Sequence, residues 1–221
     1  MKYKYEKKTR SDIEIRIHHR YNEVIHKVML RQERTVYPML YKEEDFHGKN
    51  GKIYTLRSPS PADAVDMLSY LKQSAAETEH GLSYPEELDL TVQEEESFIA
   101  GAAADPGRIM ISAFDGDNLV GNASLSCVIN RKKTAHRAEF GIAILKSHWG
   151  QGLGGKILSE LIAAARQAGY EQLELEVVAT NTAAISLYQK LGFKVYGQRP
   201  NSFKLKSGAY SDELLMAMDL K

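Results

Sequence analysis

Apolar and polar residues alternate with a period of two in several short segments of the chain, which predicts β-strands. The first segment is "KIYTLRS", at residues 52–58. Two more, at 108–114 and 119–129, flank the turn "DGDN" and therefore predict a β-hairpin. The remaining predicted strands are residues 136–145, 172–178, 193–199 and 214–220.

Two helices are predicted between the first strand and the hairpin. Ser60 and Pro61 are typical of a helix start, and Thr91 with Glu94 forms a capping-box pair. Helical spacing places the buried face of the first helix at Val65, Leu68, Leu71 and Ala75.

Two further helices are predicted in the second half of the chain. One follows the glycine-rich stretch "HWGQGLGG" and ends at Gly169. Its apolar stripe consists of Leu153, Ile157, Leu158, Leu161, Ile162 and Ala165. The other is short, begins at Asn181 and stops at Gly192.

From residue 52 onward the order of predicted elements is βααβββαβαββ. This order predicts an α/β (α+β) fold, with a mixed central sheet and helices on both faces. The stretch "HGKNG", residues 47–51, is typical of a linker or a tight turn. We therefore divide the chain into an N-terminal extension at 1–50 and a domain at 51–221.

The extension differs from the domain in charge. It holds 12 Lys or Arg against 8 Asp or Glu, and four of the seven His. A strand is predicted at 13–17, and 21–40 is ambiguous between a helix and a hairpin. The basic excess leaves a nucleic-acid arm open, but an added strand or a partner-binding flap is the preferred interpretation.

Composition narrows the function classes. The 221 residues carry 29 Lys plus Arg and 29 Asp plus Glu, so a nucleic acid is not expected as the main partner. No apolar run of membrane-spanning length and no apolar signal core occurs, so we expect a cytoplasmic protein. The single cysteine, Cys127, lies in an apolar run and is expected to be inert. No metal site is expected, because neither Cys nor His has ligand spacing.

Four glycines at 150–155 open the third helix, where backbone N–H groups and the helix dipole favour phosphate. Three phosphate loops fit this stretch. The nucleotide-triphosphate loop requires Ser or Thr where Ile157 stands. The dinucleotide fingerprint is disfavoured, because the repeated βαβ array that it requires does not surround this turn, but the acidic residues Glu171, Glu174 and Glu176, about 20 positions on, keep it open. A coenzyme A pyrophosphate loop fits as well, beside the alternative of a plain strand-to-helix turn.

The runs "FGIAILKSHWGQGLGGKIL" and "LELEVVATNTAAISLYQKLGF" together resemble the GNAT superfamily of N-acetyltransferases. The resemblance covers roughly residues 52–221 and implies the GNAT fold, with a mostly antiparallel sheet. Residues 176–188 look like those of ribosomal-protein alanine acetyltransferases. The ending "KSGAYSDELLMAM" looks more like amino-acid and polyamine N-acetyltransferases.

The resemblance implies acetyl-CoA as co-substrate and places its contacts. The pyrophosphate would meet Trp149, Gly150, Gln151, Gly152, Leu153 and Gly154. Trp149 departs from the pattern, since the superfamily usually has Gln or Arg there. Backbone atoms of Ile142, Ala143 and Ile144 would pair with the pantetheine arm, by strand addition. Asn181 matches a cofactor-contacting position, with a plain helix N-cap as the alternative.

Transfer to an amine requires a base for the amine and an acid for the departing thiolate. Tyr188 stands where the family places the acid, with a packed core tyrosine as the alternative. Glu176 stands where the alanine acetyltransferases place the base. Glu139 is a rival base, solvent is a third alternative, and Glu176 as an exposed sheet carboxylate is a fourth.

The segment 77–96 contains eight acidic residues and no Lys or Arg. It is either a solvated acidic face or a field that attracts a cationic amine. We therefore expect an acyltransferase that acetylates a primary amine of a small molecule or peptide N-terminus. The alternative is a catalytically weak CoA-binding regulatory or interaction module. A homodimer is left open.

Overall fold

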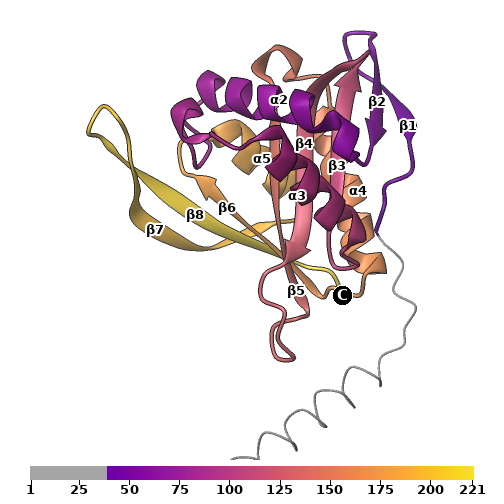
Figure 1. Ribbon diagram of the computed structural model, residues 1–221. Coiled ribbons are helices and arrows are strands. Elements are labelled where there is room, and N and C mark those ends of the chain that lie inside the picture. Colours follow the sequence, from indigo (N-terminus) through magenta and orange to yellow (C-terminus); the bar gives the residue numbers. More distant parts are fainter. Residues whose placement is uncertain (1–38) are drawn as a thin grey trace, which may run out of the picture. The chain divides into compact units, whose positions relative to one another are not determined.

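The computed structural model describes residues 39–221, and they form one mixed sheet covered by helices (Figure 1). The strand predicted at 13–17 and almost all of the ambiguous segment 21–40 lie outside the described residues. The sheet has eight strands in the order β1-β2-β3-β4-β5-β6-β8-β7. Their bounds are β1 Glu44–His47, β2 Ile53–Arg57, β3 Ile109–Asp115, β4 Asn118–Cys127, β5 Arg137–Ile144, β6 Gln172–Val178, β7 Lys194–Lys204 and β8 Tyr210–Asp219.

Every neighbouring pair of strands is antiparallel except β5 and β6, which run parallel. The helices are α2 (Ala64–Glu77), α3 (Val92–Ala104), α4 (Leu153–Gln167) and α5 (Thr182–Lys190), with short 3-10 turns at Pro61–Asp63, Pro85–Glu87 and Lys146–His148. In Figure 1, α2 and α3 cross one face of the sheet and α4 lies behind it. The element order and the mixed α/β fold predicted from the sequence are confirmed.

The stretch 47–51 forms a tight turn and not a linker. Its two flanking strands, β1 and β2, pair with each other from Glu44↔Leu56 to His47↔Ile53. Gly51 has a φ of +80°, which a turn glycine adopts without strain. The sheet therefore begins at Glu44, before the boundary predicted at residue 51.

The helices differ in how well periodicity predicted their buried faces. All six residues of the stripe predicted for α4 are buried. In α2 the buried residues are Ala64, Met67 and Tyr70, while Val65 is 60% exposed. The predicted face of α2 is therefore wrong at Val65, whereas Leu68, Leu71 and Ala75 are half-buried at the edge of the true face.

Among residues 39–221, no helix is long and apolar enough to cross a membrane.

Candidate active site

The glycine-rich turn has a backbone conformation that only glycine adopts without strain. Gly150 and Gly152 have φ values of +75° and +92°, and Gly152 is the N-cap of α4. Leu153, the first residue of α4, is buried. Because the first N–H groups of a helix have no partner within it, the turn presents free donors at one point.

Gly154 is required for a different reason. A Cβ atom there would lie 3.2 Å from Cδ2 of Leu187 and 3.5 Å from Cδ1 of Ile144. The absence of a side chain at this position therefore lets α4 approach α5 and β5 closely.

Trp149 ties the turn to the end of β5. Its indole Nε1 donates to the carbonyl oxygen of Ile144 at 2.6 Å, and the side chain is 43% exposed. The amide of Gln151 donates to the carbonyl oxygen of Trp149 at 3.1 Å. The one side-chain donor of Trp149 is thus used within the protein.

The strand β5 has an open edge. It pairs with β6 only from Arg137↔Gln172 to Glu139↔Glu174, whereas its pairing with β4 continues to Ile144. The sheet therefore separates between β5 and β6 beyond Glu139.

The hydroxyl group of Tyr70 fixes which backbone groups face this opening. It donates to the carbonyl oxygen of Ala143 at 2.7 Å and accepts from the N–H of Asn122 at 3.1 Å, so Ala143 faces β4. Neighbouring residues of a strand point their backbone groups to opposite edges, so those of Ile142 and Ile144 face the opening. Of the three residues expected to meet the pantetheine arm, two thus present their backbone there. The sequence analysis missed Tyr70, and only the tyrosine within an otherwise apolar helix face could have indicated it.

Tyr188 lies beside the open edge. It is 8% exposed, and its ring packs edge-on against Phe140 of β5, with centroids 5.8 Å apart. Burial raises the pKa of Tyr188 to about 12. The phenol therefore keeps its proton at neutral pH and could donate it to a thiolate.

Asn181 caps the helix that carries Tyr188. Its side-chain oxygen accepts from the N–H of Ala184 at 3.2 Å. The structure thus gives Asn181 the capping role, and its cofactor contact stays a prediction.

Glu139, Glu174 and Glu176 lie on one face of β5 and β6, since Glu139 is level with Glu174 in the register. Glu174 forms a two-point ion pair with Arg137, at 2.5 and 2.6 Å. Glu176 forms another with Arg199 of β7, at 3.0 and 3.2 Å.

Glu139 differs from its two neighbours. Within residues 39–221 its carboxylate has no ion-pair or hydrogen-bond partner. Partial burial, followed by the charges of Glu176 and Glu174, raises its pKa. Of the two bases considered from the sequence, Glu139 is the one whose lone pairs are free.

Arg199 is a second residue that the sequence analysis missed. Besides Glu176 it binds Glu213 of β8, which is 3% exposed. Nothing in the sequence pairs these side chains, because they come together only when β7 pairs with β8 and β8 pairs with β6.

The loop between α2 and α3 reaches the turn between β7 and β8. The hydroxyl of Tyr84 accepts from the N–H of Lys206 at 3.0 Å, and the ammonium of Lys206 pairs with Glu86. Glu94 caps α3, and Glu77 accepts from the N–H of Lys146 at 2.6 Å. Several carboxylates of the acidic segment 77–96 therefore have structural partners.

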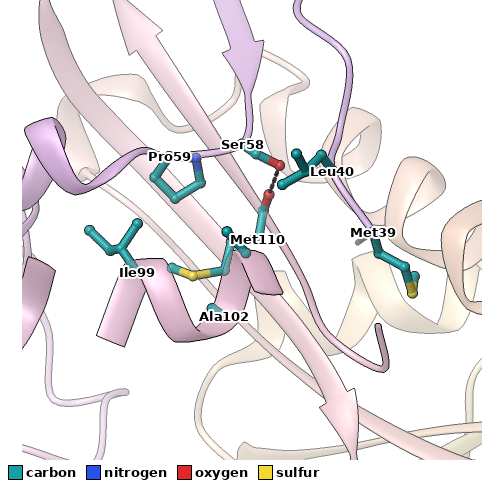
Figure 2. A pocket seen from close by; sticks show the side chains of 8 residues that line it. Met39, Leu40, Ser58, Pro59, Ile99, Ala102 and Met110 are labelled. Atoms are coloured by element: carbon teal, nitrogen blue, oxygen red, sulfur yellow. Dashed lines mark hydrogen bonds between the residues drawn. The ribbon is translucent and has the colours of Figure 1, made fainter. Parts of the chain in front are cut away.

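Two hollows lie near these elements. The first is apolar, holds about 10 Å³ and contains no predicted site residue (Figure 2). Its volume admits no more than about one water molecule, so it is no substrate site. The second holds about 470 Å³ and includes both Arg137 and Glu174 of the carboxylate face.

Comparison with known proteins agrees with this geometry. A profile of the acetyltransferase (GNAT) family matches residues 70–193. The L-amino acid N-acyltransferase MnaT of Escherichia coli K12 is 35% identical over 85 residues, which are 38% of this chain and 49% of the relative. The [ribosomal protein bS18]-alanine N-acetyltransferase of the same strain is 38% identical over 81 residues, or 37% of this chain and 54% of the relative. The chain thus spans about half the length of these curated relatives.

A solved structure supports the fold. An acetyltransferase of the GNAT family from Streptococcus pneumoniae superposes with a TM-score of 0.72 at 29% identity, covering 75% of this chain and 99% of its own. The family match spans more than half of the chain and includes the glycine turn, β5 and Tyr188. On these grounds the chain belongs to the acetyltransferase (GNAT) family.

Proposed function

We propose that this protein transfers an acetyl group from acetyl-CoA to a primary amine, by direct attack within a ternary complex. The observation that carries the proposal is the open edge of β5. It begins at the glycine turn and ends at two neighbouring residues: Glu139, whose carboxylate is unpaired within the described residues, and Phe140, which packs against the protonated phenol of Tyr188.

The chain offers one contact for each part of acetyl-CoA. The N–H groups of the turn at 150–154 bind the pyrophosphate, aided by the dipole of α4. The backbone of Ile142 and the N–H of Ile144, whose carbonyl oxygen accepts from Trp149, bind the pantetheine amides as an added strand would. The thioester then lies near Phe140, where β5 and β6 begin to separate.

Glu139 and Tyr188 supply the two proton transfers. The carboxylate of Glu139 accepts a proton from the ammonium of the acceptor, directly or through one water. The free amine attacks the thioester carbonyl carbon and a C–N bond forms. As the C–S bond breaks, Tyr188 donates its proton to the departing thiolate, and the nitrogen releases its second proton, which returns to the Tyr188 phenolate directly or through water. We assign the base to Glu139 and not Glu176, because the guanidinium of Arg199 occupies both carboxylate oxygens of Glu176.

The acceptor is a primary amine of a small molecule or a peptide N-terminus. The relatives named above act on amino acids or on the alanine of a ribosomal protein, and both present an α-amine. Carboxylates outnumber cations on the face that carries Glu139, which favours a cationic acceptor. The cytoplasmic location and the absence of a nucleic-acid partner stay predictions.

Release of free thiol from acetyl-CoA tests the proposal. The purified chain is incubated with acetyl-CoA and a panel of amino acids, polyamines, aminoglycosides and N-terminal peptides. At least one acceptor should raise thiol release well above the rate without acceptor. Binding of acetyl-CoA with no turnover on any amine would support a CoA-binding module instead.

A further inference from the structure

The β1–β2 hairpin, which lies outside the residues matched by the family profile, contacts the glycine turn. The backbone N–H of Lys49, in the hairpin turn, donates to the carbonyl oxygen of Gln151 at 3.3 Å. A Cβ atom on Gly152 would lie 3.3 Å from Cζ of Phe46, so the ring of Phe46 covers this glycine.

An ion pair joins the same hairpin to the start of α4. The carboxylate of Glu44 in β1 lies 2.5 Å from the ammonium of Lys156, which also pairs with Glu160 at 2.7 Å. The hydroxyl of Tyr41 donates to Glu44. The first turn of α4 is therefore held to β1 by a charged contact as well as an apolar one.

Strand β2 and the residues beside it orient the residue that precedes Trp149. The ring of Tyr54 packs edge-on against His148, with centroids 5.8 Å apart. The Nε2 atom of His148 lies 3.3 Å from Asp115, which also pairs with Lys52 at 2.5 Å. The hairpin thus contacts the glycine turn on both sides of Trp149.

We propose that the β1–β2 hairpin is a positioning element of the cofactor site and that Phe46 is its main positioning residue. Glycines adopt many backbone conformations, so a turn with four of them is mobile unless its surroundings restrict it. Phe46 restricts Gly152 at the φ that aims the N–H groups at the pyrophosphate. A preorganised site binds more tightly because less freedom is lost on binding. This inference rests on the proposed use of the turn for acetyl-CoA.

Removal of the Phe46 ring tests the proposal in the full-length chain. In Phe46→Ala, calorimetric titration should show acetyl-CoA binding about tenfold more weakly. The KM for acetyl-CoA should rise by a similar factor, while kcat at saturation stays unchanged. Phe46→Leu should restore most of the affinity, because an apolar side chain again covers Gly152.

A matched control separates positioning from general stability. Phe98 of α3 is 49% exposed and lies outside the turn, and Phe98→Ala should leave the KM for acetyl-CoA unchanged. If Phe46→Ala does not fold, Glu44→Gln takes its place, since this change removes the charge of one of the two carboxylates that pair with Lys156. It should raise the KM for acetyl-CoA about threefold.

The outcomes distinguish the two proposals. An unaltered chain that does not bind acetyl-CoA contradicts the proposed function. An unaltered chain that binds it, together with a Phe46→Ala variant of equal affinity, overturns the role of the hairpin alone. An unchanged KM in Glu44→Gln, where that variant is needed, overturns it as well.

Discussion

The two ends of β5 are held by different kinds of interaction. At its C-terminal end, the glycine turn depends on positive φ angles at Gly150 and Gly152 and on apolar contacts to neighbouring elements. At its N-terminal end, Glu174 and Glu176 depend on ion pairs with arginines from other strands. Backbone geometry and packing respond little to salt and pH, whereas exposed ion pairs respond to both. The end proposed for the cofactor is therefore mainly a geometric template, to which the Glu44–Lys156 pair adds one charged contact, and the end proposed for the acceptor depends more on charge.

The largest expected effect comes from a substitution in the glycine turn. Gly152→Glu should reduce acetyl-CoA binding below detection in calorimetry. The substitution places a Cβ at a φ of +92°, within 3.3 Å of Phe46, and brings a carboxylate to the phosphate site.

Gly169→Glu is the matched control for strain. Gly169 has a φ of +83°, lies just beyond the other end of α4, and has no atom within 4 Å of an added Cβ. It should lose stability but bind acetyl-CoA normally. Equal loss of binding in both variants would mean that strain alone, and not the turn, explains the first result.

The glycine turn and the helices beside it are also the part that the sequence predicted well. The buried stripe of α4, the glycines before it and the N-cap of α5 at Asn181 are all local features, because each depends on residues within one or two helical turns. Phe46 was not predicted as part of it, since "HGKNG" permitted either a linker or a turn, and only the turn brings Phe46 to Gly152.

The acceptor end was predicted less well, for a physical reason. Glu139 and Glu176 look alike in sequence, both being charged residues on alternating strands. Arg199 distinguishes them, and it reaches Glu176 from β7, 23 positions further along the chain. Tyr70 was missed for a similar reason, because its hydroxyl joins Asn122 of β4 to Ala143 of β5, far from Tyr70 in the sequence.

The next largest effect concerns Tyr188, the proposed general acid. Tyr188→Phe should lower kcat by about 10²-fold, the usual scale for loss of a general acid. Affinity for acetyl-CoA should change little, since the ring and its packing on Phe140 remain. Steady-state kinetics with the best acceptor from the amine panel measures both.

Tyr170→Phe serves as the control for removing a tyrosine hydroxyl. Burial also raises the pKa of Tyr170 to about 12, and its hydroxyl donates to the carbonyl oxygen of Gly107. It should alter stability and leave kcat unchanged. Normal turnover in Tyr188→Phe would assign protonation of the thiolate to water.

A smaller effect, which depends on pH, distinguishes the carboxylates. Glu139→Gln should lower the rate at pH 7 on the order of tenfold, since solvent replaces the base only in part. The loss should shrink as pH rises, because more of the acceptor is already deprotonated. Because the pKa of Glu139 is raised, the rate of the unaltered enzyme should fall with decreasing pH earlier than an ordinary glutamate would cause.

Glu176→Gln is the comparison, and its rate should change less and without this pH dependence. Arg199 already holds that carboxylate, so its basicity contributes little to the reaction. If the pH-dependent defect appeared in Glu176→Gln and not in Glu139→Gln, the two roles would be exchanged.

The smallest effect tests whether the acidic segment 77–96 attracts a cationic acceptor. Lys206 and Glu86 are both more than half exposed, and their pair joins the β7–β8 turn to the loop between α2 and α3. Lys206→Ala frees the negative charge of Glu86, so the KM for a cationic acceptor should fall about two- to threefold at low salt. At about 1 M salt the Debye length is about 3 Å, and the difference should disappear. Lys221→Ala breaks a similarly exposed pair, with Glu171, outside this loop and should not change the KM. A decrease that persists in high salt would show that Lys206 acts through the packing of its side chain on the ring of Tyr84, whose centroid lies 4.1 Å from the ammonium, and not through long-range charge.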